Sequence, residues 1–266
     1  MLVRWFYEGK MRWLDQVKKR IRRYTATYGF TCDGCGGELF DYPTHRLCQR
    51  CENGLHFNDG RTCKKCGRAT LAEGVCLSCK SHAPRFTRGL SPFIYRGKSA
   101  SFVNRIKTGT PILANYFAER MCDCLLKGFD GMDAFYGEGM DALLLIPVPL
   151  TDKRVAERGY NQAVLLAERL EELFQEKGYR VELRLDVLVK TRETAQQKHM
   201  GSSSRALNVA GAYHIHDRKG CRGRTVVLVD DIMTTGATGS ECASRFISAG
   251  AEQVIFLTGA SLPEQK

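Results

Sequence analysis

The 266-residue sequence lacks any long apolar run. No stretch approaches the ~18–20 consecutive apolar residues that a membrane-spanning helix needs. The N-terminal stretch MLVRWFYEGKMRWLDQVKKRIRR carries scattered charges, and it lacks both the uninterrupted apolar core and the small-residue cleavage site of a secretion signal. These absences predict a cytoplasmic protein without a transmembrane segment.

Acidic residues are scarce at one end of the chain. Residues 1–85 hold 16 Lys and Arg against 8 Asp and Glu, whereas residues 86–266 hold 24 and 21. The first third therefore carries a net charge of +8 out of the total of +11. An excess of this sign favours an anionic partner such as nucleic acid, acidic lipid or acidic protein. A solvated basic face is the alternative for the run KKRIRR (18–23).

Eight of the twelve cysteines form four C-x-x-C pairs. Two thiolates at this spacing reach one Zn²⁺ from a tight turn, and two such turns complete a tetrahedral shell of four sulfurs. The sequence therefore predicts two structural zinc sites, a double zinc ribbon, with the ligands Cys32, Cys35, Cys48, Cys51, Cys63, Cys66, Cys76 and Cys79. Bound metal would supply most of the folding free energy of this segment, because it holds few large apolar residues.

Other roles fit these pairs less well. Disulfides are rare in a reducing cytoplasm, and a thioredoxin-type redox motif is usually a single pair in a βαβ unit. How the pairs share their metals stays open: sequential sharing, 32/35 with 48/51 and 63/66 with 76/79, keeps each loop short, and interleaved sharing is the alternative. The other four cysteines lack ligand spacing, and we expect buried core thiols at positions 122, 124, 221 and 242.

From residue 85 onward the pattern becomes that of an α/β protein. Continuous apolar runs predict buried strands, and apolar stripes at helical spacing predict the helices between them. The expected strands are 143–148, 185–189, 225–229 and 254–257, and the expected helices are 161–177 and 239–249. We therefore predict a basic N-terminal extension (1–30), a small zinc-ribbon module (31–84) and an α/β domain with a parallel sheet flanked by helices (85–266).

Within this domain, the stretch VVLVDDIMTTGATG (226–239) combines a strand, two acids and a polar loop. Its buried strand is expected to end at Val229, so that Asp230 and Asp231 emerge at the carboxyl edge of the sheet, where open α/β sheets bind ligands. The loop leads into a helix N-terminus, whose free N–H groups and positive dipole end attract anions. The expected phosphate cradle consists of Thr234, Thr235, Gly236, Ala237 and Thr238.

Carboxylates suit sugar hydroxyls or Mg²⁺ rather than a phosphate, so the stretch predicts a ligand with hydroxyls on one side and a phosphate on the other. A Walker loop is excluded because no lysine follows the glycine, and a dinucleotide fingerprint is excluded because G-x-G-x-x-G is absent. The stretch resembles the phosphoribosyl-pyrophosphate (PRPP) signature of type I phosphoribosyltransferases. The resemblance implies that Asp230 and Asp231 hold the ribose 2- and 3-hydroxyls, with Mg²⁺ nearby, and that residues 234–238 hold the 5-phosphate. The alternative is a chance acidic turn after a strand.

The resemblance extends to one branch of these proteins, the ComF/GntX-like family. It is carried by the cysteine pairs and by three further segments: YRGKSASFVNRIKTG (95–109), IPVPLTDKRVAERGYNQAVLLAERL (146–170) and residues 189–213. The family couples a double zinc ribbon to a type I phosphoribosyltransferase-like domain. It is associated with natural competence, the uptake of single-stranded DNA, beside a helicase-like partner. The resemblance covers nearly everything from Cys32 to Ala260, and it implies a protein that binds PRPP or a related ribose 5-phosphate with Mg²⁺ and serves DNA uptake.

By their places in the matching segments, five basic residues are candidates for neutralising the departing diphosphate and closing the site: Arg158, Arg192, Lys107, Arg154 and Arg205. The turn 147–151 would meet the pyrophosphate with its backbone, and the polar segment 190–208 would be a lid. The chemistry would be phosphoribosyl (glycosyl) transfer in nucleoside metabolism, to an acceptor that the shared motif does not specify. The alternative function is a zinc-ribbon protein that binds single-stranded DNA or acts as a scaffold, with a phosphate pocket that is not catalytic.

Overall fold

The computed structural model describes residues 31–39, 46–137, 142–191 and 209–264. The chain divides into two compact units, Met1–Cys48 and Gln49–Lys266. The expected basic extension, most of the expected lid, and two of the candidate basic residues lie outside the described residues; these two are Arg192 and Arg205.

The described part of the first unit is a tight turn. Thr31 and Glu38 form an antiparallel bridge. Within the turn, the N–H of Cys32 donates to the carbonyl of Gly37 (2.8 Å), and the N–H of Gly36 donates back to the carbonyl of Cys32 (2.7 Å). The turn therefore holds the two cysteines of the first C-x-x-C pair close together, as a metal-binding knuckle requires.

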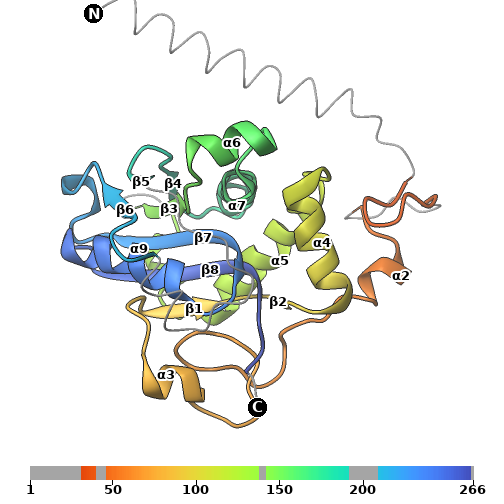
Figure 1. Cartoon of the computed structure of the whole chain (residues 1–266), viewed down its shortest axis with the longest axis horizontal. Coiled ribbons are helices and arrows are strands. Elements are labelled where there is room, and N and C mark those ends of the chain that lie inside the picture. Colours follow the sequence, from red (N-terminus) through yellow and green to blue (C-terminus); the bar gives the residue numbers. More distant parts are fainter. Residues whose placement is uncertain (1–30, 40–45, 138–141, 192–208, 265–266) are drawn as a thin grey trace, which may run out of the picture. The chain divides into compact units, whose positions relative to one another are not determined.

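The second unit alternates strands and helices, as predicted (Figure 1). Its strands are β1 (Arg88–Leu90), β2 (Phe93–Ile94), β3 (Leu143–Pro147), β4 (Val181–Leu183), β5 (Leu188–Lys190), β6 (Tyr213–Ile215), β7 (Thr225–Met233) and β8 (Gln253–Ser261). Its α-helices are α2 (Gln49–Glu52), α3 (Leu77–Ser81), α4 (Gly97–Thr108), α5 (Leu113–Gly128), α6 (Asp152–Arg158), α7 (Gln162–Glu176) and α9 (Ala237–Ser248). Two 3₁₀ turns, η1 (Met132–Phe135) and η2 (Lys219–Cys221), complete the described elements.

Six strands form one sheet with the order β1-β8-β7-β3-β4, and β2 also pairs with β8. Every pair in this sheet is parallel. All residues of β3 and the first five of β7 are buried, as expected for central strands covered on both faces. The predicted parallel sheet flanked by helices is thereby confirmed. The strand predicted at 185–189 begins later, as β5, and within the described ranges it pairs only with β6, in a separate antiparallel ribbon.

Alternate residues of the central strands face two different layers. On one face, Leu144, Val226 and Phe256 share a core cluster with Phe246 of α9. On the other, α7 packs on β3, β4 and β7, and α5 packs on α7 and β8. The cluster on the α9 face also contains four buried cysteines, Cys63, Cys66, Cys76 and Cys79. The module boundary predicted at residue 84 therefore falls inside the second compact unit.

The strand β7 is longer than predicted. We expected it to end at Val229, but it continues to Met233, and Asp230 still pairs with Thr258 of β8. The physical reason is that β8 is equally long and continues the ladder. On the other side, β3 ends at Pro147, which pairs with Val229. The two acids thus lie on a projecting length of β7, beyond the carboxyl end of β3.

Candidate functional site

Asp230 and Asp231 are neighbours in β7, so their side chains are expected to point toward opposite faces of the sheet. The Asp231 side chain is only 4% exposed and contacts α4 and α7. Asp230 Oδ1 accepts a hydrogen bond from the N–H of Asp231 (2.9 Å), and the charge of Asp230 acts on Tyr213 and Cys242 of the α9 layer. Burial, and then the charge of Asp231, raises the pKa of Asp230 well above its ordinary value, while Lys107 opposes the rise. A hydroxyl donor or a cation beside Asp230 would therefore be stabilising.

Two of the predicted basic residues belong to the surroundings of Asp231. Lys107, near the end of α4, places Nζ 2.7 Å from Asp231 Oδ2. Gln162, the first residue of α7, donates from Nε2 to Asp231 Oδ1 (3.3 Å) and accepts a bond from Arg158 Nη1 at Oε1 (3.1 Å). Gln162 is buried, so this connected set of hydrogen bonds fixes the orientation of the carboxylate.

The sequence did not single out Gln162 or its neighbours. The Tyr160 hydroxyl donates to a carbonyl of α4, and Asn161 caps α7 and donates from Nδ2 to the carbonyl of Val148 (3.0 Å). An asparagine in front of an apolar helical stripe is a readable capping signal. Nothing local shows that the next residue contacts Asp231, which lies 69 positions further along the chain.

The loop between β7 and α9 presents unpaired backbone donors. Gly236 has a φ of +84°, the left-handed region that favours glycine, and it is the N-cap of α9. The N–H groups of Thr235, Gly236, Thr238 and Gly239 have no hydrogen-bond partner among the described residues. A Cβ atom on Gly239 would lie 2.4 Å from a ring carbon of Phe256, so the start of the helix packs directly on the sheet. Four free donors at a helix N-terminus suit an anion such as a phosphate.

Further polar groups lie on the Asp230 side of the strand. Burial raises the pKa of Tyr213, the charge of Asp230 adds to the rise, and Arg154 and a hydrogen bond with Thr238 oppose it. Asp230, Arg154 and Thr238 therefore all act on the Tyr213 hydroxyl. The turn 147–151 was predicted to meet a pyrophosphate. In this turn the Thr151 hydroxyl is buried and has no hydrogen-bond partner among the described residues. This hydroxyl would gain from a polar ligand.

The eight predicted zinc ligands gather in two groups. The ligand atoms within each group all lie within 4.8 Å of one another. The first group is Cys32, Cys35, Cys48 and Cys51, and the second group is Cys63, Cys66, Cys76 and Cys79. The pairs are therefore shared sequentially, and the interleaved alternative is wrong.

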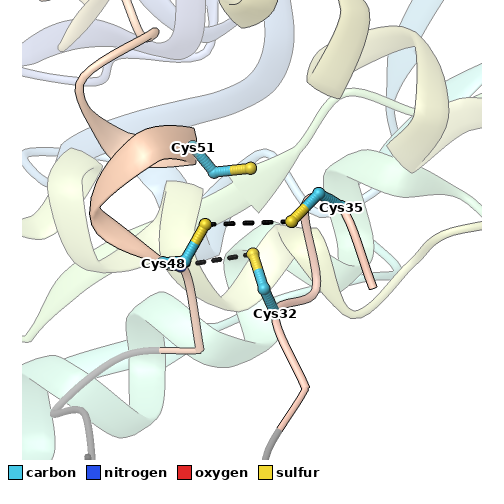
Figure 2. Close-up of side chains that lie close together, drawn as sticks. All are labelled: Cys32, Cys35, Cys48 and Cys51. Carbon is cyan, nitrogen blue, oxygen red and sulfur yellow. Dashed lines mark hydrogen bonds between the residues drawn. The ribbon is translucent and has the colours of Figure 1, made fainter. Parts of the chain in front are cut away.

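Figure 2 shows the thiols of the first cysteine group pointing toward one another. The Sγ atoms of Cys35 and Cys48 are 3.8 Å apart, and the N–H groups of Gly34 and Cys48 donate to Cys32 Sγ (3.3 and 3.2 Å). A tetrahedral site with Zn–S bonds of about 2.3 Å separates its sulfurs by about 3.8 Å, whereas a disulfide would need about 2.05 Å. The donor set and its spacing therefore fit zinc.

The second cysteine group has the same geometry and is fully buried. The Sγ atoms of Cys66 and Cys76 are 3.7 Å apart, and the N–H groups of both residues donate to Cys63 Sγ (3.5 and 3.3 Å). A hydrogen bond from Cys79 lowers the pKa of Cys66 to about 5 against the effect of burial, and Arg68 adds to the lowering. A thiolate is therefore favoured at Cys66, as zinc ligation requires.

Three of the four remaining cysteines belong to the core. Cys122, Cys221 and Cys242 are fully buried, as predicted, while Cys124 is half-buried. Burial raises the pKa of Cys122 to about 12 and that of Cys124 to about 11. These thiols are therefore poor nucleophiles. In the described part of the chain, none of the helices is long and apolar enough to cross a membrane.

Comparisons with known proteins agree with this arrangement. Residues 155–265 match the family model described as a phosphoribosyl transferase domain. The chain is 27% identical over 205 residues to "Competence protein ComFC" of Bacillus subtilis, covering 74% of this chain and 75% of that protein. It is 25% identical over 213 residues to "DNA utilization protein YhgH" of Escherichia coli, covering 78% and 87%. It is 31% identical over 111 residues to "Competence protein F" of Haemophilus influenzae, covering 41% and 46%.

The parallel sheet and the matched segment define a phosphoribosyltransferase-type domain, and the two cysteine groups fit a zinc-ribbon module. The chain is similar to competence and DNA utilization proteins over about three quarters of its length. The predicted resemblance to the ComF/GntX-like family is confirmed at 25–31% identity.

Proposed function

We propose that this protein binds PRPP, or a related ribose 5-phosphate, together with Mg²⁺. The proposal is carried by one juxtaposition: four N–H groups without a partner among the described residues follow shortly after the acid pair on the projecting end of β7, at Thr235, Gly236, Thr238 and Gly239. Anion donors on the loop and carboxylates on the strand together suit a phosphate at one end of a ligand and hydroxyls or a cation at the other. The domain match over residues 155–265 supports the same class of ligand.

In this proposal the loop residues Thr234, Thr235, Gly236, Ala237 and Thr238 hold the 5-phosphate. Asp230 and Asp231 hold the ribose hydroxyls. Because Asp231 is already bound to Lys107 and Gln162, its main effect is to position the ligand, whereas Asp230 gains more from a new hydroxyl or cation. Asp230 and Asp231 would help to hold Mg²⁺, which would neutralise part of the diphosphate charge.

The reaction that we propose is phosphoribosyl transfer, in which diphosphate leaves as a ribose bond forms to an acceptor. The protein must hold the departing anion and stabilise charge that develops in the transition state. In this proposal the task falls to Lys107, Arg158, Arg154, Arg192 and Arg205. Two contacts support it: Lys107 pairs with Asp231, and Arg158 donates to Gln162. The relatives' names mention competence and DNA utilization, and they support extending the proposal to DNA uptake in natural competence. The predicted role in nucleoside metabolism, and a reducing cytoplasm that keeps the eight thiols available for zinc, remain part of the proposal.

Calorimetric titration tests the proposal. Zinc-loaded protein is titrated with PRPP in the presence and absence of Mg²⁺, and the double variant Asp230→Asn/Asp231→Asn is compared with the exposed control Asp152→Asn on α6. We expect Mg²⁺-dependent binding that the control keeps and the double variant weakens by about 100-fold or more, because two hydrogen bonds to charged groups are lost. Absence of binding by folded, zinc-loaded protein would refute the proposal.

A second candidate function is binding of single-stranded DNA, which the net charge of +8 in residues 1–85 and the names of the relatives support. Contacts with the DNA backbone release counterions, so the affinity should fall steeply with salt. Replacing the basic residues of the run 18–23 by Gln should flatten the salt dependence without altering PRPP binding. Salt-independent DNA binding, or DNA binding that survives these replacements unchanged, would contradict this placement. A competence helicase is the partner to test next, by co-purification with each variant.

A further inference from the structure

A single buried arginine connects the second cysteine group to the ligand loop. Arg68 is 6% exposed. Its Nε donates to Cys66 Sγ (3.2 Å), and its Nη2 donates to the carbonyl oxygen of Thr234 (3.1 Å). Thr234 lies 166 positions further along the chain, at the start of the loop that leads to α9. One rigid guanidinium therefore contacts a zinc-ligand thiol and the backbone of the ligand loop at the same time.

The turn that carries Arg68 is fixed to the sheet through its backbone. A Cβ atom on Gly67 would lie 2.2 Å from the carbonyl oxygen of Gly89 in β1, so the two backbones are in direct contact. The N–H of Gly89 donates back into this turn (2.8 Å), and the N–H of Glu264 donates to the carbonyl of Ala69 (2.8 Å). Because its backbone is held on both sides, Arg68 projects from a defined position.

The charge of Arg68 needs a counter-charge, because a buried cation without one is strongly destabilising. Among the ion pairs of the described residues, none joins Arg68 to a carboxylate. A Zn²⁺ ion with four thiolates has a net charge of about −2. In its metal-bound form, the second cysteine group therefore supplies the negative charge that stabilises Arg68.

The hydrogen bond to Thr234 also fixes the orientation of the next peptide group. A trans peptide is planar, and its C=O and N–H point in opposite directions. While Arg68 holds the carbonyl of Thr234, the N–H of Thr235 must point away from the arginine. This N–H is one of the four that have no partner among the described residues. Arg68 thereby sets the direction of the first donor in the cradle.

We propose that Arg68 is a positioning residue through which metal at the second cysteine group and a ligand at the loop 234–238 stabilise each other. The identity of the ligand rests on the proposed function, but the link between metal and loop does not. Because such coupling is reciprocal, metal should raise the affinity for the ligand, and the ligand should slow the loss of the metal by the same route. The first cysteine group has Gly37 at the position that corresponds to Arg68, so it lacks a side chain for this link.

Zinc-release kinetics test the reciprocal effect in the full-length, zinc-loaded protein. A chromogenic chelator should release zinc in two phases, and the variant Cys35→Ser assigns the phase of the first cysteine group by removing it. We expect saturating PRPP with Mg²⁺ to slow the phase of the second group about fivefold or more. Arg68→Ala should abolish this slowing, and the control Arg61→Ala, an exposed arginine of the same turn region, should keep it. Unchanged slowing in Arg68→Ala would overturn the proposal.

Hydrogen exchange tests the link without any ligand. In zinc-loaded protein, we expect Arg68→Ala to raise amide exchange at the hydrogen-bonded N–H groups of Ala237 and Ser240 about tenfold relative to wild type and to Arg61→Ala, because the loop loses its anchor. If Arg68→Ala fails to fold, Arg68→Lys replaces it, with an intermediate rise, since one ammonium cannot reproduce the fork that contacts both partners. Failure of PRPP to bind wild type would refute the proposed function alone, whereas unchanged exchange in a folded Arg68 variant would refute the role of Arg68.

Discussion

The two cysteine groups have the same ligand chemistry but differ in what surrounds them. In each, the first cysteine N–H donates to the carbonyl five residues on, at Gly37 in one turn and at Arg68 in the other (2.8 and 2.9 Å). In the first group Cys35 is exposed and Cys48 is half-buried. In the second group all four cysteines are buried and share the core cluster of the sheet. The same metal-binding turn is therefore used once near the surface and once as part of a domain core.

This difference shows that a cysteine group suited to zinc can belong to the core of a sheet, even when its sequence predicts a separate module. Cys63 and Cys66 lie in one core cluster with Phe86, Val226 and Phe246. Loss of metal from a site of this kind affects the sheet that it packs against, whereas loss from an exposed site affects mainly its own turn. The two groups should therefore respond differently to equivalent substitutions.

The largest expected contrast is between Cys66→Ser and Cys35→Ser, which alter equivalent positions. Each variant should lose one zinc per chain. We expect Cys66→Ser to lower the free energy of unfolding of the sheet-containing unit by about 4 kcal/mol or more, because a buried metal centre in the core is lost. Cys35→Ser should change the free energy of unfolding of the same unit by less than about 1 kcal/mol.

Zinc content and far-UV circular dichroism in denaturant would measure these effects. Tryptophan fluorescence is unsuitable, because both tryptophans lie in residues 1–30. Equal destabilisation by the two substitutions would contradict the contrast between the groups.

A substitution in the acid pair should change the protein while both cysteine groups stay intact. The pKa of Asp230 is raised in the folded state above its unfolded value, so ionisation favours the unfolded state, and stability falls as pH rises above about 4. Asp230→Asn should therefore raise the melting temperature at pH 7 by about 2–4 °C, while PRPP binding is lost and zinc content stays unchanged. The gain should disappear near pH 3, where the wild-type carboxyl is protonated in both states. A lower melting temperature at pH 7 would contradict this account.

A smaller effect is expected from Gln162→Leu, which removes the amide between Arg158 and Asp231. PRPP affinity should fall about tenfold, because Asp231 loses one of its two positioning contacts. Both zinc sites should remain occupied. Gln175→Leu, at an exposed position on the same helix, is the matched control. Equal affinities of the two variants in calorimetry would remove Gln162 from the site.

The smallest effect is expected when an arginine is added to the turn of the first cysteine group. Gly37→Arg places an arginine in the first turn at the position that corresponds to Arg68. The new side chain should remain solvated, so PRPP affinity and the zinc-release rate of the second cysteine group should stay within about twofold of wild type. A clear rise in affinity would show that arginine in either turn acts through charge alone, and would contradict the positioning role of Arg68.

The sequence was sufficient for features that depend on local patterns. The spacing of the C-x-x-C pairs predicted all eight members of the two cysteine groups, and apolar periodicity predicted β3, α7 and α9 closely. The predicted end of β7 was wrong because strand length depends on the partner, and β8 extends the ladder past Asp230.

The contacts between distant segments could not be predicted. Lys107 was placed at the site by resemblance, but its ion pair with Asp231 and the roles of Gln162 and Arg68 depend on chain segments that meet only in three dimensions. Arg68 in particular reads as a surface residue next to a cysteine pair. Only the fold buries it and brings Thr234 within hydrogen-bond distance.

The most direct test of the account is amide NMR of zinc-loaded protein labelled selectively with ¹⁵N-glycine and ¹⁵N-threonine. It would follow Thr235, Gly236, Thr238 and Gly239 during titration with ribose 5-phosphate. If these four N–H groups cradle the phosphate, their signals should shift together and saturate at one ligand per chain, while Gly37 in the first cysteine group stays unchanged. If the four signals stay in place at saturating ligand in a folded, zinc-loaded protein, the loop does not hold a sugar phosphate and the central claim is wrong.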